Sequence, residues 1–130
     1  MSAAAISNAI GRTESGNRDY TASGAPMTSP KGAMFRMQVM PETAHDPGFG
    51  ITPARNNSPA EFNRVGEAYW RAMLKEYGSV PKMLGAYNAG PGRMNSLLGR
   101  YGDDWLRYAP EETRNYVTNN LCLLGLQGGY

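Results

Sequence analysis

The 130-residue sequence lacks the features that would place it in several classes of protein. It has one cysteine, Cys122, which excludes an internal disulfide framework and which we expect to be a small buried hydrophobic residue. No run of about 20 apolar residues is present, so no membrane-spanning segment is expected. Lys and Arg exceed Asp and Glu only by 13 to 11 and form no basic patch, so we expect no nucleic-acid partner.

Ligands for a metal ion are equally scarce. His45 is the only histidine, and its surroundings show none of the ligand spacings of a zinc site. We therefore expect neither a metal ion nor a cofactor. The N-terminus also lacks a basic start followed by an apolar run, so no signal peptide is expected. If the protein acts outside the cytoplasm, another component must carry it there.

What is present is typical of a globular protein with many short helices. A hydrophobic fraction of 41% and a length of 130 residues predict one domain over residues 1–130. The 16 glycines and 9 prolines predict tight turns between short elements. Helical spacing and capping signals predict helices over residues 2–15, 41–44, 58–77, 81–89 and 93–102, and a last helix that begins near residue 110. Alternating apolar side chains predict a strand or extended hairpin over residues 33–40.

The helix that begins near residue 58 has the clearest start signal. Ser58 is a typical N-cap, and Pro59 suits the first helical position. Glu61 would complete a capping box by bonding back to the main-chain N–H of Ser58. Taken together, the pattern predicts a mainly α fold of five to seven helices with a minor β element.

Glu14 lies at an unusual position on the first helix. Ile6 and Ile10 begin an apolar stripe at helical spacing, and Glu14 continues it. Burial of an unpaired carboxylate is costly and raises its pKa, and a protonated carboxyl group is what a general acid requires. Two alternatives remain open on the residues alone. The helix could fray and turn Glu14 to solvent, or a nearby arginine, Arg12 or Arg18, could pair with it.

Four ordered segments carry a resemblance to a known family. They are "ESGN" at 14–17, "SPKGAMFRMQVMPETA" at 29–44, "AYNAGPG" at 86–92 and "ETRNYV" at 112–117. In this order they resemble the soluble lytic transglycosylase family, which has the goose-type lysozyme fold. The resemblance implies an α+β lysozyme-like fold with a small β-hairpin element beside the active-site cleft.

The resemblance also implies roles for individual residues. Glu14 would be the catalytic residue, and the substrate-binding residues would be Ser29, Met37, Gln38, Tyr87, Asn88 and Tyr116. Among these, Ser29 would hydrogen-bond near the acid, the Gln38 amide would contact the sugar, and Tyr116 would orient the catalytic carboxylate. For each of them, ordinary packing is the alternative.

Two departures from the family pattern affect the expected cleft. The loop between Glu14 and Ser29 is longer than in the family, and Phe35-Arg36 stands where the family has Gly-Leu. A glycine there would allow close approach of the backbone, which phenylalanine does not. An aromatic ring at this position could instead stack on a sugar face.

By resemblance, the substrate is the glycan strand of peptidoglycan. Glu14 would act as acid and then as base, cleaving the bond between N-acetylmuramic acid and N-acetylglucosamine and leaving 1,6-anhydromuramyl ends. No second acid matches the family pattern, and we expect the other acids of this region, Asp19, Glu42 and Asp46, to be solvated loop charges.

Other functions remain open at this stage. The closest is a lysozyme-type hydrolase on the same fold. The others are an inactive wall-binding or structural module and a helical interaction domain with accidental motif matches. Since similar domains occur in bacteriophage virion proteins and in secretion machines, we expect a virion-associated protein. It would act on the host cell wall in the periplasm.

Overall fold

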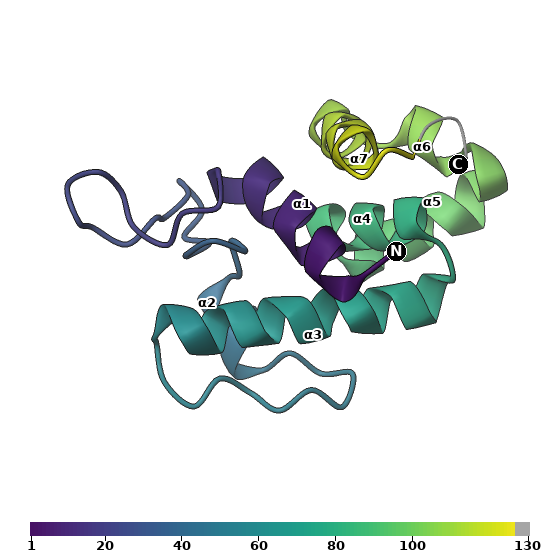
Figure 1. Cartoon of the computed structure of the whole chain (residues 1–130). Helices are drawn as coiled ribbons and strands as arrows, with labels where there is room; N and C mark the ends of the chain where they lie inside the picture. Colours follow the sequence, from purple (N-terminus) through teal and green to yellow (C-terminus); the bar gives the residue numbers. More distant parts are fainter. Residues whose placement is uncertain (127–130) are drawn as a thin grey trace. The chain divides into compact units, whose positions relative to one another are not determined.

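The computed structural model describes residues 1–126, and the chain divides into two compact units. Unit 1 comprises Met1–Tyr69, and unit 2 begins at Trp70. The described elements are α1 (Ala3–Ser15), α2 (Pro41–His45), α3 (Pro59–Tyr77), α4 (Val80–Ala89), α5 (Pro91–Tyr101), the 3₁₀ helix η1 (Gly102–Asp104), α6 (Trp105–Tyr108) and α7 (Glu111–Leu123) (Figure 1). The expectation of a single domain over residues 1–130 stays a prediction.

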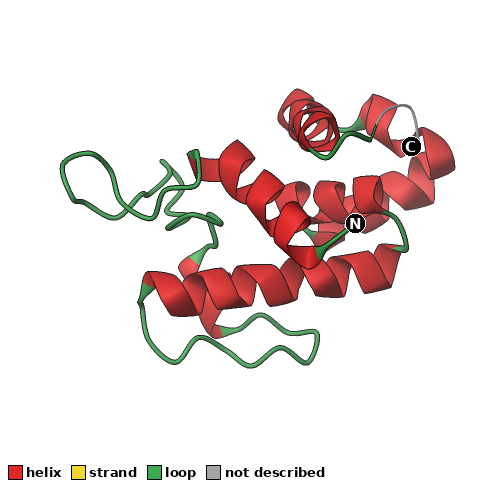
Figure 2. Cartoon of the chain, viewed as in Figure 1, coloured by secondary structure: helices red, strands yellow, loops and turns green. Residues whose placement is uncertain are grey.

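The mainly α prediction is confirmed, and the strand predicted over residues 33–40 is wrong. Residues 1–126 contain no extended strand (Figure 2). The β structure is reduced to isolated bridges that pair Tyr20 with Pro26, Thr28 with Met34, and Met34 with Val39. The pair of Met34 and Val39 closes a four-residue turn, so the expected hairpin is reduced to this single antiparallel pair. Phe35 and Gln38 adopt φ values of 66° and 52°, and this left-handed backbone cannot continue a strand.

The first helix forms as its sequence predicts. The Ser2 hydroxyl accepts a hydrogen bond from the Ala5 N–H, which caps the N-terminus of α1. Ile6 and Ile10 lie on its buried face. Gly16 ends the helix with a φ of 66°, and its N–H donates to the Arg12 carbonyl. The helix predicted over residues 2–15 is therefore confirmed, with a glycine as its C-cap.

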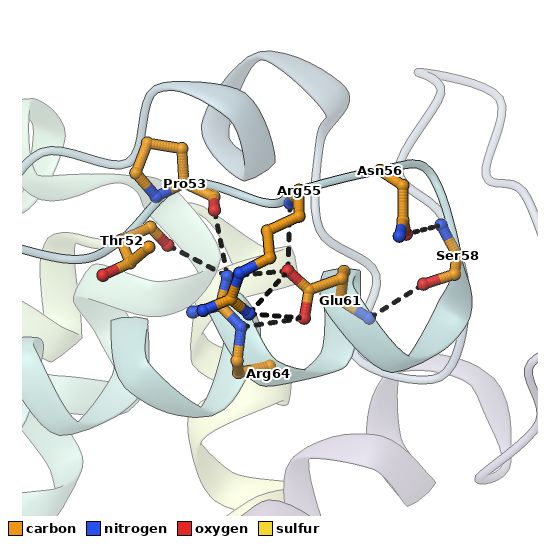
Figure 3. A network of polar contacts seen from close by, with 7 residues as sticks. All are labelled: Thr52, Pro53, Arg55, Asn56, Ser58, Glu61 and Arg64. Atoms are coloured by element: carbon orange, nitrogen blue, oxygen red, sulfur yellow. Dashed lines mark hydrogen bonds and ion pairs between the residues drawn. The ribbon is translucent and has the colours of Figure 1, made fainter.

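The start of α3 confirms one half of the expected capping box. The Ser58 hydroxyl accepts a hydrogen bond from the Glu61 N–H at 3.2 Å, as an N-cap does. The other half of the prediction is wrong, because the Ser58 N–H donates to Asn56 Oδ1 at 3.0 Å instead of to Glu61 (Figure 3). The Glu61 carboxylate is directed to two arginines, so it is not available to complete the box.

Glu61 joins the loop before α3 to the helix. Its carboxylate accepts hydrogen bonds from the Arg64 side chain and from the Arg55 N–H, which lower its pKa to about 2, below its usual 4.5. The Arg64 guanidinium also donates to the carbonyls of Thr52 and Pro53 (Figure 3). These bonds hold the loop that precedes α3 against the first turn of the helix.

Replacing Glu61 by glutamine is expected to destabilise the protein in a pH-dependent way. Because folding lowers the pKa of Glu61, its contribution to stability is fully present above about 4.5 and is lost as the pH falls toward about 2. Thermal unfolding at a series of pH values should therefore show the largest deficit for Glu61→Gln at neutral pH and a shrinking deficit in acid. Glu42→Gln, at an exposed position, controls for the loss of one negative charge. A deficit that does not change with pH would contradict this account.

Unit 2 is built around the α4 helix. The side chains of Trp105 and Met94 are buried and lie against Gly85 of α4, where a β-carbon would come within 2.7 Å of Trp105 Cζ3. Val117 and Leu121 of α7 are buried. Cys122 is exposed, so its prediction as a buried residue is wrong: it occupies the outer face of α7, next to the buried Leu121. Among residues 1–126, no helix has both the length and the apolar character needed to cross a membrane.

Candidate active site

Glu14 lies in the last turn of α1 and is half-buried. The helix continues through Ser15, so the alternative in which fraying turns Glu14 out to solvent is wrong. The Arg18 guanidinium donates to the Ser15 carbonyl at 3.3 Å. The alternative in which Arg12 or Arg18 pairs with Glu14 stays untested. The half-buried carboxyl group at this helix end therefore remains the leading catalytic candidate of unit 1.

Ser15 joins the helix end that carries Glu14 to the 34–39 turn. Its side chain is 8% exposed, and its hydroxyl donates to the Arg36 carbonyl at 2.8 Å. The Gly11 carbonyl, at 3.1 Å, is a second acceptor within the helix. The Ser15 hydroxyl oxygen itself accepts a hydrogen bond from the Arg18 N–H. The serine of the "ES" pair thus has a structural role beside the acid.

Side chains satisfy the remaining polar groups of the turn. The Arg36 N–H donates to Asp19 Oδ1 at 2.9 Å, and the Met37 N–H donates to Asn63 Oδ1 at 3.2 Å. The Asn63 amide nitrogen donates to the same Asp19 oxygen at 2.8 Å. The peptide of Arg36 and Met37 is therefore held by side chains from α1, from the following loop and from α3.

Phe35 does not have the sugar-stacking role that its aromatic ring suggested. Its side chain is 3% exposed and packs edge-on against the rings of Phe62 and Tyr20. Its φ of 66° lies in the left-handed region that glycine adopts without strain. The position where the family has glycine thus requires a backbone conformation that a phenylalanine occupies at a cost, and burial of the ring offsets that cost.

The left-handed backbone at Phe35 predicts an inverted order of two substitutions. Both Phe35→Ala and Phe35→Gly remove the buried ring, but only glycine relieves the strain, so Phe35→Gly should be more stable by about 1 kcal/mol. Val39 is also buried and has no positive φ, so there alanine should be the more stable of the two by about 0.5–1 kcal/mol. Chemical denaturation of the four variants measures both differences. The same order at both positions would exclude the left-handed conformation at Phe35.

The Gln38 amide is partly committed to the protein itself. Its Nε2 donates to the carbonyl of Phe35 at 2.8 Å and to that of Met27 at 3.2 Å. Both bonds use the nitrogen, which leaves the amide oxygen as the atom with which Gln38 would accept a hydrogen bond from a sugar. The predicted substrate contact of Gln38 therefore stays a prediction, narrowed to one atom.

Two other predicted binding residues of unit 1 have internal contacts. The Ser29 hydroxyl accepts from the Ala33 N–H at 3.0 Å. Met37 is 2% exposed and lies against α3, where a β-carbon on Gly66 would come within 2.9 Å of the Met37 Cβ. Gly66 thus permits the close approach of α3 to the turn. Contacts of Ser29 and Met37 with a substrate stay predictions.

Unit 2 contains the other three predicted site residues. Tyr87 and Asn88 lie near the end of α4 and are half-buried, and Tyr116 of α7 is 6% exposed. The Thr113 hydroxyl of α7 donates to Asn88 Oδ1 at 2.8 Å. This bond joins α4 to α7 one turn before Tyr116, so within unit 2 the two helix segments that carry the predicted residues lie side by side. The amide of Asn88 has a packing role here, and its contact with a substrate stays a prediction.

Asp19 and Asn63 are the residues that sequence reasoning missed. Asp19 was expected to be a solvated charge, which is wrong, because it is half-buried and accepts two hydrogen bonds. Asn63 is 8% exposed in the first turns of α3, next to the buried Phe62. A polar residue in such a place was a signal in the sequence, but its partner lies 44 positions earlier in the chain.

A cavity of about 550 Å³ lies in unit 1, next to this network of hydrogen bonds. Its walls include Asn8 of α1, Arg36 of the turn, and Asn63 and Glu67 of α3. Glu14 is not among the described residues that line it, so we do not take this cavity as the reaction site. Within the described part of the chain, no cluster of three or more histidine, cysteine or acidic side chains could hold a metal ion.

Comparison with known proteins shows the family to which this chain belongs. The profile of the transglycosylase SLT domain family matches residues 2–106, which is most of the chain, and the chain belongs to this family. The matched range includes Glu14 and every other predicted site residue except Tyr116. The mainly helical fold and the "ES" pair at the end of α1 agree with that membership.

Individual relatives extend this result. The soluble lytic murein transglycosylase of Escherichia coli K12 is 32% identical over 119 residues, which cover 81% of this chain and 18% of that protein. The solved structure of a lytic transglycosylase from Pseudomonas aeruginosa, an inactive mutant, is similar with a TM-score of 0.71 and 32% identity, and 92% of this chain aligns with 20% of it. The 70 kDa soluble lytic transglycosylase of Escherichia coli is similar with a TM-score of 0.73 and 30% identity, and 92% of this chain aligns with 20% of that structure. The chain thus spans about a fifth of the length of these relatives.

Proposed function

We propose that the chain is a peptidoglycan lytic transglycosylase whose single catalytic residue is Glu14. The observation that carries the proposal is the half-buried carboxyl group in the last turn of α1, in a chain of the transglycosylase SLT domain family. The proteins it resembles are named lytic transglycosylases, and one is named for murein. The proposed substrate is therefore the glycan strand of peptidoglycan.

The place of Glu14 in the helix favours the role of a general acid. Negative charge is disfavoured near the C-terminal end of a helix, because the last carbonyl groups point toward it. Ser15 then holds this helix end to the turn that carries Gln38, which is the residue proposed to contact the sugar.

The proposed reaction needs no water. Glu14 donates its proton to the oxygen between N-acetylmuramic acid and N-acetylglucosamine, and the bond from this oxygen to the muramyl anomeric carbon breaks. The C6 hydroxyl of the same muramyl residue attacks that carbon and gives its proton to the Glu14 carboxylate. A 1,6-anhydro ring closes, and Glu14 is protonated again. Because the attack is intramolecular, correct positioning of the sugar supplies much of the rate.

Three other acids of unit 1 are hydrogen-bonded within the protein or exposed, which favours a mechanism with one carboxylate. Hydrolysis by a glycosidase ordinarily uses two carboxyl groups, one of which is a nucleophile or a base for water. Asp19 accepts hydrogen bonds from Arg36 and Asn63, and Glu61 is paired with Arg64. Glu42 is exposed on α2. In the Pseudomonas aeruginosa relative, an inactive mutant carries glutamine in place of one glutamate, which supports an essential glutamate in this family.

Release of soluble fragments from purified peptidoglycan tests the proposal. The protein should lower the turbidity of a peptidoglycan suspension and release muropeptides, whereas heat-denatured protein should not. Binding to peptidoglycan without release would favour the inactive wall-binding module. Neither binding nor release would favour a helical interaction domain.

Delivery to the wall is a separate proposal. We propose a virion- or secretion-associated protein that acts on the host cell wall in the periplasm, because domains that resemble this one occur in bacteriophage virion proteins and in secretion machines. Mass spectrometry of purified particles from the source of the gene tests this. Recovery only from the host's periplasm, without particles, would contradict it.

A further inference from the structure

We propose that Asp19 is a positioning residue that fixes the Phe35–Gln38 turn beside the end of α1 that carries Glu14. The inference rests on the proposed function for its catalytic consequence, and on hydrogen bonds within unit 1 for its structural basis. Asp19 lies in the loop that follows α1, and no resemblance to the family assigns it a role.

The turn needs an outside support because it lacks a strand ladder. Phe35 and Gln38 have left-handed backbones, so only Met34 and Val39 pair across the turn. The polar main-chain groups of Arg36 and Met37 therefore depend on other partners, because an unsatisfied buried group is costly. Three side chains supply these partners.

Asp19 is at the centre of this support. Its Oδ1 accepts hydrogen bonds from the Arg36 N–H at 2.9 Å and from the Asn63 amide at 2.8 Å. Asn63, oriented by this second bond, uses its own oxygen to accept from the Met37 N–H at 3.2 Å. The carbonyl of Arg36 accepts a further hydrogen bond from the Ser15 hydroxyl. The Asp19 carboxylate thus orders the Arg36 N–H directly and the Met37 N–H through Asn63.

A second chain of bonds connects Asp19 to Gln38. The Asp19 carbonyl accepts from the Met27 N–H at 2.9 Å. The Met27 carbonyl in turn accepts from the Phe35 N–H at 2.7 Å and from Gln38 Nε2 at 3.2 Å. The orientation of the Gln38 amide therefore depends on Asp19 through both its side chain and its main chain. Loss of the carboxylate should loosen the turn and misplace Gln38 relative to Glu14.

The test compares Asp19→Ala with Asp19→Asn in the full chain. Alanine removes the acceptor, and we expect turnover on soluble glycan strands to fall by about ten- to a hundredfold, as misplacement of a substrate-positioning group does. The fall should be larger in kcat than the change in KM. Asparagine keeps an oxygen for Arg36 and Asn63, so its turnover should stay within about threefold of wild type. Asp46→Ala, at an exposed position of unit 1, is the matched control.

Amide hydrogen exchange separates this proposal from the proposed function. In Asp19→Ala, the N–H groups of Arg36 and Met37 should exchange at least about tenfold faster, because each opening of a hydrogen bond exposes them to solvent. Unchanged exchange at both would overturn the proposal, whatever the activity. Faster exchange with unchanged kcat per folded molecule would overturn the role in the reaction. If wild type releases nothing from peptidoglycan, the proposed function fails, and exchange alone decides whether Asp19 orders the turn.

A second pair of variants covers the case in which Asp19→Ala does not fold. Asn63→Asp keeps the acceptor for Met37 but places a carboxylate against that of Asp19, and its turnover should fall about tenfold. In the double variant D19N/N63D, the amide at position 19 can donate a hydrogen bond to the carboxylate at position 63. Its turnover should therefore recover part of the way toward wild type. A double variant no better than Asn63→Asp would contradict direct coupling of the two side chains.

Discussion

Glu14→Gln is expected to reduce the release of muropeptides by at least about a thousandfold, because general acid and base catalysis each contribute about 10²–10⁴-fold. In the proposed mechanism the same carboxyl group supplies the proton to the leaving sugar and removes the proton of the C6 hydroxyl. Glutamine is nearly isosteric but does neither. The measurement is the rate of release per folded molecule at matched concentration.

The fold should survive this substitution. The Ser15 bond to Arg36 and the cap at Gly16 do not involve the Glu14 side chain. The melting temperature of Glu14→Gln should therefore equal or exceed that of wild type, since catalytic groups often reduce stability. Glu42→Gln, exposed on α2, should retain full activity. Activity of Glu14→Gln close to that of wild type would remove Glu14 from the mechanism.

Trp105→Ala is expected to cause the largest loss of stability, about 3–5 kcal/mol. The ring is 2% exposed and lies against the backbone of α4 at Gly85, two residues before Tyr87. Its removal leaves a cavity beneath the helix that carries Tyr87 and Asn88. The melting temperature should fall by more than about 10 °C.

An exposed aromatic residue of α6, the helix that contains Trp105, provides the control. Tyr108 is 51% exposed and stacks on Tyr101, with ring centroids 4.0 Å apart. Tyr108→Ala should cost no more than about 1.5 kcal/mol. Equal losses at the two positions would contradict the packing of Trp105 against α4.

Local signals in the sequence were sufficient for helices α1 and α3, whereas the short helices η1 and α6 were not predicted. The hydroxyl group of Ser58 and the glycine at position 16 act as caps within one turn of the helix they delimit, so a short window of sequence contains the whole interaction. The capping box failed because Glu61 had a stronger alternative partner in Arg64. That competition involves residues of the same first turn, yet its outcome depends on the loop around Arg55.

The turn at residues 35–38 could not be predicted from periodicity. Alternation of apolar residues is the pattern of a strand, but the left-handed backbones of Phe35 and Gln38 interrupt it. The resemblance did contain the relevant signal, because the family has glycine where Phe35 stands. The role of Asp19 was missed for a different reason. Its partners, Arg36 and Asn63, are distant in the sequence, and only the fold brings them together.

The candidate site was predicted residue by residue from motif resemblance, and the structure refines what several residues can offer. Gln38 uses its amide nitrogen internally, and Asn88 accepts from Thr113. Ser29 caps its own turn. These bonds are local consequences of packing that a motif does not contain, and they reduce the number of atoms free to contact a sugar.

The nature of the new glycan ends tests the central claim most directly. Peptidoglycan is digested with the protein, reduced with borohydride and analysed by mass spectrometry. If the muramyl C6 hydroxyl is the nucleophile, the new ends are 1,6-anhydromuramyl residues, which are lighter than the hydrolytic product by one water and resist reduction. If the new ends are instead reduced by borohydride, water was the acceptor. The lysozyme-type hydrolase would then replace the transglycosylase mechanism.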